Sequence, residues 1–454
     1  MKALISNKSM ALLAFGVLFI ICCVAAVYPT SFPTPEQPYD AIMVGNIAWM
    51  LVATSLVLLM TPGLAFFYGG MVSKKNIIST MLQSFICLGV VTLLWYVVGF
   101  SLAFGDDLGG LGIIGNPATY FMFNGVGTAI DAAKDGHPAI GGGIPLVLFA
   151  AFQLKFAIIT PALITGSFAE RVRFWAYVVF INLFIILIYC PLAHMAWHPD
   201  GFLLKKGVLD FAGGTVVHIS AGCAAFAGAI ILGRRNGGEA LPVNIPFVIL
   251  GTGLLWFGWF GFNAGSALAA NAMAIKAFVN TNLASAIAAV TWIMIDVIKG
   301  KKASALGACI GAVVGLVAIT PAAGYVNYGP SLFIGFVAAI ASNFAVVLFR
   351  SKTTVDDTLD VFPCHGIGGI TGMLLTAVFA TEGGKGIIAG DWNLMVQHLI
   401  ALAIVIPFTF GGSYILFKLT NIITPLRVDE ESELEGLDIS QHDETIETSL
   451  EVAL

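Results

Sequence analysis

Two histidines lie in the middle of apolar segments, where an ionisable side chain is costly and usually faces a partner or a water-filled path. His218 follows Asp210 by eight residues in DFAGGTVVHISAGCAAFAGAII, and His365 lies in DVFPCHGIGGITGMLLTAVF, which begins at Asp360. Burial disfavours the charged imidazolium, so we expect two neutral rings that exchange hydrogen bonds. The pattern predicts that the two segments form two walls of one site.

Small residues surround both histidines. They are Gly213, Gly214, Ser220, Ala221 and Gly222 around the first, and Gly366, Gly368, Gly369 and Gly372 around the second. Small side chains let helices approach closely inside a bilayer. Both segments are therefore expected in the middle of a helical bundle.

The composition is that of an integral membrane protein. The 454 residues are 58% hydrophobic and only 10% charged, whereas soluble domains carry about 25% charged residues. The 51 glycines fit close helix packing in lipid. Long apolar runs recur along the chain, and they favour helices over a β-barrel.

Eleven apolar segments are each long enough to cross a bilayer, which takes roughly 17 to 25 residues. They lie near 43–68, 76–104, 145–166, 174–196, 212–233, 244–266, 275–298, 304–321, 331–349, 361–381 and 394–424. We therefore expect an all-α membrane domain of eleven transmembrane helices over residues 28–425.

The N-terminal residues 1–27 resemble a secretory signal peptide, because Lys2 and Lys8 precede an apolar run that ends in small residues. The run is also long enough for a retained helix. In either case the chain reaches the outer side before residue 40.

The charges of the loops predict the orientation. The loops on one side of the membrane hold thirteen Lys and Arg residues and those on the other side hold five. The side with thirteen is expected to face the cytoplasm across the cell membrane. Residues 426–454 follow on that side. Ten of the 26 acidic residues lie between Asp429 and Leu454, which predicts a solvated acidic tail.

The chain also repeats itself five spans apart. The third and eighth spans both end in Ile-Thr-Pro-Ala, the first and sixth end in aromatic and glycine residues, and the histidine segments are the fifth and tenth. Elements five spans apart cross in opposite directions. The pattern predicts an inverted repeat, with halves at about 41–233 and 244–381 and a site at their interface.

The seven cysteines are scattered through apolar segments and form no disulfide framework or metal motif. We expect buried free thiols, no metal, no cofactor, no nucleic-acid partner and no enzymatic activity.

Several stretches resemble the ammonium transporter/Rhesus family, on its bacterial or archaeal ammonium-transporter side. They are FQLKFAIITPALITGSFAERV (152–172), AHMAW (193–197), LDFAGGTVVHI (209–219), GWFGFNAGSA (258–267), DVFPCHGIGG (360–369) and LRVDEESELEGLD (426–438). The resemblance implies a homotrimer in the lipid bilayer with one pore in each subunit. It also implies ammonium and methylammonium as substrates and a P-II nitrogen-signalling protein at the cytoplasmic face.

The resemblance also implies roles for seven residues. Trp197, Ser266 and Phe156 would form an outer recruitment site, Phe156 and Phe262 a gate, and His218 and His365 the pore. Asp210 would shape the outer site without touching the ion. These seven residues are Phe156, Trp197, Asp210, His218, Phe262, Ser266 and His365.

Elementary chemistry supports these roles to different degrees. An indole face attracts a small cation by about 0.5–2 kcal/mol, and a hydroxyl accepts one of the four hydrogen bonds that ammonium donates. Without the family, however, Trp197 is typical of an interface anchor, and two of 34 phenylalanines are ordinary core residues. Asp210 and Asp360 both precede helices, where a carboxylate caps free N–H groups.

The sequence departs from the family pattern at Lys155 and Asp443. Lys155 precedes the outer gate phenylalanine, either at a subunit interface or as a cation near the gate that impairs conduction. Asp443 stands where the family tail usually has a glycine. Three alternatives to a transporter remain. They are an ammonium sensor with impaired conduction, a protein whose two histidines ligate a haem iron, and a Rhesus-type channel for neutral gas.

Overall fold

The computed structural model describes residues 7–131, 139–236, 238 and 242–446. Its secondary structure over these residues is helical apart from isolated β-bridges. The long helices are α1 (Asn7–Val27), α2 (Ala41–Gly69), α3 (Ile77–Leu94), α5 (Leu146–Ile164), α6 (Phe174–Phe184), α9 (Ser220–Leu232), α10 (Ile245–Gly265), α11 (Ala272–Ile298), α12 (Ala305–Ile319), α13 (Tyr328–Lys352), α14 (Gly368–Phe379) and α15 (Asn393–Ile423). Short helices are α4 (Phe100–Phe104), α7 (Cys190–Trp197), α8 (Phe202–Lys205), α16 (Glu430–Glu435) and α17 (Leu437–His442).

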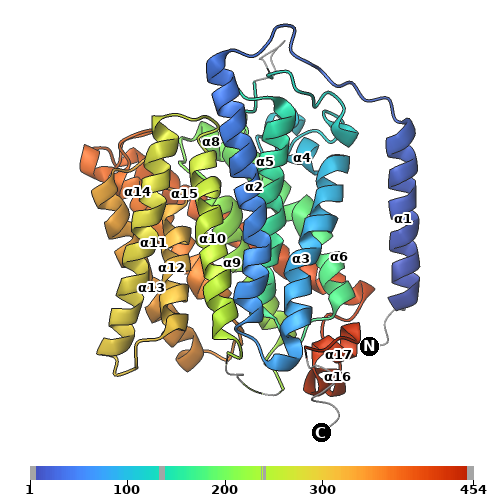
Figure 1. Cartoon of the computed structure of the whole chain (residues 1–454), viewed down its shortest axis with the longest axis vertical. Helices are drawn as coiled ribbons and strands as arrows, with labels where there is room; N and C mark the ends of the chain where they lie inside the picture. The colour runs from blue at the N-terminus through green and yellow to red at the C-terminus, as the bar shows by residue number, and fades with distance from the viewer. Residues whose placement is uncertain (1–6, 132–138, 237, 239–241, 447–454) are drawn as a thin grey trace.

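The expected all-α membrane architecture is confirmed. Eleven helical stretches in the described residues are long and apolar enough to span a bilayer. They include α1 and leave out α12, whose 15 residues match the predicted span 304–321. Helix α12 tolerates this short length because its second half is buried among neighbouring helices. Helix α1 stands apart from the bundle (Figure 1), with only 6% of its apolar window buried.

Four short π-helical turns interrupt the spans, and the sequence pattern did not predict them. They are η2 (Trp95–Gly99), η6 (Ile185–Tyr189), η7 (Gly214–Ile219) and η8 (Phe362–Ile367). The turn η7 leads into α9 and carries His218, and η8 leads into α14 and carries His365. Such turns often mark functional positions, because the extra residue re-aims a side chain.

Corresponding elements of the two halves of the inverted repeat meet at the centre. Helices α2 and α10 pack along each other, and α9 packs against η8. A Cβ built on Gly222 would lie 2.3 Å from the backbone nitrogen of Gly366, so position 222 requires a glycine. This close approach brings the two histidine segments together, as the small residues predicted.

The acidic tail is not solvated along its whole length, which corrects the sequence-based expectation. Its start folds onto the loops at the lower end of the bundle (Figure 1), with Glu433 and Asp438 buried. The two carboxylate oxygens of Asp438 accept the free N–H groups of Ile78 and Ser79 at the start of α3, at 3.0 and 2.8 Å. Capping a helix in this way stabilises both partners, and Glu433 is held by Arg427 at 2.8 Å.

Candidate functional site

An aromatic cavity opens at the end of the bundle that lies opposite α16 and α17. Its volume is about 200 Å³, and its lining includes Gln153, Phe156, Trp197 and Ser266. The half-buried indole of Trp197 lies at the C-terminal end of α7, and its N–H donates to the Asp210 carbonyl at 3.0 Å. This hydrogen bond fixes the orientation of the indole at the cavity wall.

Phe156 lines this cavity, and its ring contacts that of Phe262 at an interplanar angle of 37°. The ring centroids of Phe156 and Phe262 are 4.3 Å apart, and that of Trp197 lies 5.8 Å from Phe156. Both phenylalanines are almost completely buried. The Ser266 hydroxyl donates to the Phe262 carbonyl at 2.8 Å, so its oxygen keeps its lone pairs for another donor.

The two histidines lie directly beyond the phenylalanine pair. Their ring centroids are 5.5 Å apart and their Nδ1 atoms 3.4 Å apart, so one Nδ1–H donates to the other ring. The indole of Trp259 stacks on His218 at 5.4 Å. His218 Nε2 is buried and has no hydrogen-bond partner among the described residues. A buried nitrogen without a partner costs free energy unless a small molecule bonds to it.

Asp210 holds the turn that carries His218. Its carboxylate accepts the backbone N–H groups of Gly213, Gly214 and Thr215 at 2.8, 2.5 and 2.8 Å, and also the Thr215 hydroxyl. Gly213 has φ 113°, a left-handed conformation that favours glycine. Asp210 is thus a structural support rather than part of the cavity wall.

Further cavities lead from the histidines to the end of the bundle that carries the tail. The cavity at the histidines has a volume of only about 10 Å³, close to that of one water-sized molecule. A second small cavity shares Phe67 and His365 with it and includes Tyr68. Beyond it opens a vestibule of about 350 Å³, which shares Leu359 with the second cavity. The site is therefore a line of cavities through the molecule, narrowest at the histidines.

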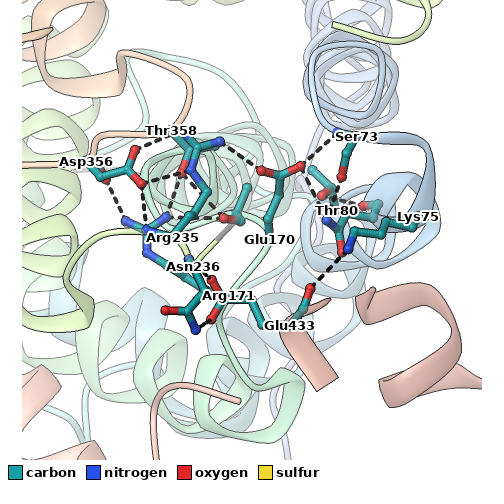
Figure 2. Close-up of polar contacts among 12 residues, drawn as sticks. Ser73, Lys75, Thr80, Glu170, Arg171, Arg235, Asn236, Asp356, Thr358 and Glu433 are labelled. Carbon is teal, nitrogen blue, oxygen red and sulfur yellow. Dashed lines mark hydrogen bonds and ion pairs between the residues drawn. The ribbon is translucent and has the colours of Figure 1, made fainter. Parts of the chain in front are cut away.

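A network of charged side chains surrounds the vestibule and ties four loops to the tail (Figure 2). Arg235 donates to Glu170 and to Asp356, each at 2.8 Å. Burial would raise the pKa of Glu170, but the hydrogen bonds from Ser73 and Arg235 outweigh it and hold this pKa below its usual range. On the tail side, Glu433 accepts the Asn236 backbone N–H at 2.8 Å.

Replacing Arg235 by alanine is expected to lower the free energy of unfolding by about 3 kcal/mol, because it leaves the buried carboxylate of Glu170 and the partly buried one of Asp356 without their partner. The side chains of Arg235 and Glu170 are only 8% and 7% exposed. Denaturant unfolding of the purified protein measures this change. Arg234→Ala is the matched control, since Arg234 is exposed. An equal effect of both substitutions would contradict the role of the network.

The structure brings together all seven residues that the sequence singled out, but it corrects the capping role expected of Asp360. The Asp360 carboxylate accepts from Arg350 at 3.0 and 2.6 Å. Asp357 caps the start of η8 instead, since its carboxylate accepts the N–H groups of Val361 and Phe362. Asp357 lies eight residues before His365, just as Asp210 lies eight residues before His218. This equal spacing is the feature of the sequence from which the capping role of Asp357 could have been predicted.

Two other contributors were not predicted from the sequence. Trp259, which stacks on His218, carried no signal beyond an apolar helix, and its indole N–H donates to Thr320 at 3.0 Å. The buried Arg171 belongs to the vestibule network through hydrogen bonds to the Thr358 hydroxyl and the Asp356 carbonyl. Lys155 is half-buried and is not among the described residues that line the cavities.

Comparisons with known proteins show which family and which fold the chain resembles. Residues 48–447 match the family model of the Ammonium Transporter Family. An ammonium transporter of Aquifex aeolicus is 46% identical over 404 residues, which cover 88% of this chain and 92% of the relative. The crystal structure of Saccharomyces cerevisiae Mep2 superposes with a TM-score of 0.79 at 34% identity, covering 87% of this chain and 89% of that chain. A structure described as "Sensor Amt Protein" also has a TM-score of 0.79, at 29% identity, covering 88% of this chain and 99% of that chain.

Proposed function

The chain belongs to the ammonium transporter family, and we propose that it carries ammonium and methylammonium across the membrane through the line of cavities. The cation is taken up at Trp197 and gives one proton near the phenylalanine pair to the hydrogen-bonded rings of His218 and His365. This pair releases a proton to the vestibule, ammonia passes between the rings and takes up a proton there, and one positive charge therefore crosses with each ammonium. This mechanism rests on the order of the cavities and on the chemistry of the side chains that line them.

Recruitment follows from the walls of the outer cavity. The face of an indole attracts a cation by about 0.5–2 kcal/mol, more strongly as water is removed. The Ser266 hydroxyl oxygen is free to accept one N–H of ammonium, because its own proton is donated to the Phe262 carbonyl. Potassium is also drawn to aromatic faces, but it donates no hydrogen bond.

Deprotonation follows from the narrow segment below. A bare ammonium ion in an apolar cavity pays a desolvation cost of many kcal/mol, whereas neutral ammonia does not. Potassium cannot lower this cost, since it has no proton to give up. Neutral imidazoles offer ammonia both a donor and an acceptor. A dry pore with two histidines therefore favours a species that can deprotonate.

The observation that carries the proposal is the unpartnered Nε2 of His218 beside a cavity of about 10 Å³. A group of this kind is satisfied by a molecule of the size of ammonia or water. Neither a hydrated ion nor a porphyrin fits this volume, so transport of a small neutral species is favoured over haem binding.

An ammonium sensor is the second candidate, because the fold resembles the structure described as a sensor protein. A sensor with impaired conduction would place the charge of Lys155 in the path. Lys155 is not among the described residues that line the outer or histidine cavities. This position favours transport over a pore blocked by Lys155.

The cellular setting is proposed from the family and the sequence. The chain acts as a homotrimer in the cell inner membrane, with the acidic tail in the cytoplasm, where a P-II protein of nitrogen metabolism binds. Residues 1–27 act as a signal peptide or as an additional apolar helix; the separation of α1 from the bundle supports a role outside the pore domain (Figure 1).

Replacing Trp197 by leucine is expected to raise the ammonium concentration for half-maximal transport by about 2- to 30-fold, the range that corresponds to losing a cation–π contact. The maximal rate should change much less, because the histidine cavity is untouched. Initial uptake rates of labelled methylammonium into proteoliposomes measure both quantities. Trp392→Leu is the control, since Trp392 is exposed and far along the chain. An unchanged half-maximal concentration would overturn the recruitment role of Trp197.

A further inference from the structure

Asp357 occupies in the second half of the repeat the position that Asp210 occupies in the first. Asp210 lies eight residues before His218, and Asp357 lies eight residues before His365. Each histidine lies in a π-helical turn, and each carboxylate accepts backbone hydrogen bonds at the start of that turn. The two halves thus supply one capping carboxyl for each histidine, and that of Asp357 lines the vestibule.

The contacts of Asp357 fix the backbone from which His365 projects. Its Oδ1 accepts the Val361 N–H at 3.0 Å, and its Oδ2 accepts the Phe362 N–H at 2.8 Å. These N–H groups have no partner further back within the turn. Pro363 follows and has no N–H to donate. The conformation at the start of η8 is therefore fixed by hydrogen bonds to the two oxygens of one carboxyl group.

Asp357 differs from the two other aspartates that line the vestibule. Asp356 accepts two guanidinium hydrogen bonds from Arg235 on its Oδ atoms, each at 2.8 Å. Asp360 accepts two from Arg350. These pairings hold both groups as anions. The carboxylate of Asp357 accepts from backbone N–H groups, which stabilise the anion less than a bidentate guanidinium does.

Titratable and charged groups face Asp357 from each element around it. Tyr68 comes from α2 and Cys364 from η8, and both interact with it electrostatically. Arg171 comes from the loop after α5, with its guanidinium donating to Asp356 and Thr358 oxygens. Asp360 comes from the same loop as Asp357. The charge of Arg171 favours the anion of Asp357, but that guanidinium donates its hydrogen bonds to other oxygens, and the negative charge of Asp360 opposes it.

These surroundings make Asp357 titrate in the physiological range. Burial, followed by the charge of Asp360, raises its pKa to about 7. Above that pH the anion offers two acceptor oxygens to the turn. Below it the protonated carboxyl carries an O–H donor and accepts more weakly, so the hold on the turn loosens as the pH falls. The vestibule gives water access to the group.

We propose that Asp357 is a positioning residue that makes the alignment of His365 depend on the pH of the compartment facing the tail. The inference rests on the proposed transport function: with Asp357 ionised His365 is held beside His218 and ammonia passes, and with Asp357 protonated the histidine pair is misaligned and transport slows. Asp210 does the same positioning at the opposite end, where it accepts four close hydrogen bonds.

The first test measures ammonium-evoked currents in proteoliposomes with the tail side inside, while the luminal pH is varied from about 5.5 to 8.5 at constant outer pH. The natural chain should lose current as the luminal pH falls through a midpoint near 7. Asp357→Asn should remove this dependence, because an amide does not titrate in this range. Asp360→Asn is the matched control: it should keep the dependence but move the midpoint to lower pH, because a neighbouring negative charge is lost.

A second measurement does not depend on transport. Infrared titration of the purified protein should show a protonated carboxyl that disappears with a midpoint near 7 and is absent in Asp357→Asn. A current without luminal pH dependence, or the same dependence in Asp357→Asn, would overturn the proposal while leaving transport intact. Absence of any current in the natural chain would instead refute the transport function, and absence of the infrared signal would refute the titration of Asp357 in either case.

Discussion

Replacing His218 by leucine is expected to reduce methylammonium uptake by at least about a hundredfold, in line with the loss of a group that exchanges protons with its substrate. Leucine fills a similar volume, so the bundle should still fold. The histidine cavity, however, loses the unpartnered Nε2 and the Nδ1 contact with His365. Uptake of labelled methylammonium into proteoliposomes, at matched protein density, measures the effect.

The control for this experiment is Cys223→Ala. Cys223 is buried in α9, five residues beyond His218, and is not among the described residues that line the cavities. A small core truncation of this kind should cost some stability but little uptake. If His218→Leu transported as well as Cys223→Ala, the histidine pair would have no part in conduction.

Replacing Asp210 by alanine is expected to lower the free energy of unfolding by more than about 3 kcal/mol and to abolish uptake. The substitution leaves the buried N–H groups of Gly213, Gly214 and Thr215 without their acceptor, and each unsatisfied buried group costs about 1–3 kcal/mol. The turn η7 then no longer holds His218 in place. Denaturant unfolding and uptake, measured on the same preparation, test both parts.

Asp40→Ala is a matched control for this loss. Asp40 also caps a helix, since its carboxylate accepts the Met43 N–H at 2.7 Å at the start of α2, but it is exposed to solvent. Its replacement should cost about 1 kcal/mol, the usual value for a helix cap. An equal loss of unfolding free energy in the two variants would show that Asp210 is an ordinary helix cap and does not hold the turn that carries His218.

The residues singled out from the sequence lie close together in the structure, but Trp259 and Asp357, which contact the two histidine segments, were not predicted. His218 and His365 are recognisable because burying an ionisable group in an apolar, glycine-rich segment costs free energy, so that such a group usually has a function. Trp197, Ser266 and the phenylalanine pair are recognisable only through the family motifs, since single aromatic residues are common in membrane helices. The close packing of Gly222 on Gly366 follows from the small residues around the histidines.

Other features depend on interactions that periodicity does not encode. The π-helical turns of both histidines keep the same hydrophobic pattern as an α-helix and differ by one inserted residue. Asp360 is the carboxylate nearest to the start of its helix and was therefore expected to cap it. Its carboxylate instead accepts hydrogen bonds from Arg350, and Asp357 accepts the free N–H groups at the start of η8. The many charges of the tail predicted a solvated segment, yet two of its carboxylates are buried. Glu433 is paired with Arg427, and Asp438 accepts N–H groups at the start of α3.

The most direct test of proton-coupled ammonium passage through the histidine pore is the charge moved when proteoliposomes containing the natural chain receive a pulse of ammonium. We expect a transient current that saturates with ammonium concentration, is absent with an equal pulse of potassium, and is lost in His218→Leu. A silent natural chain that gains current in Lys155→Thr would contradict it and would identify the protein as a blocked pore used for sensing.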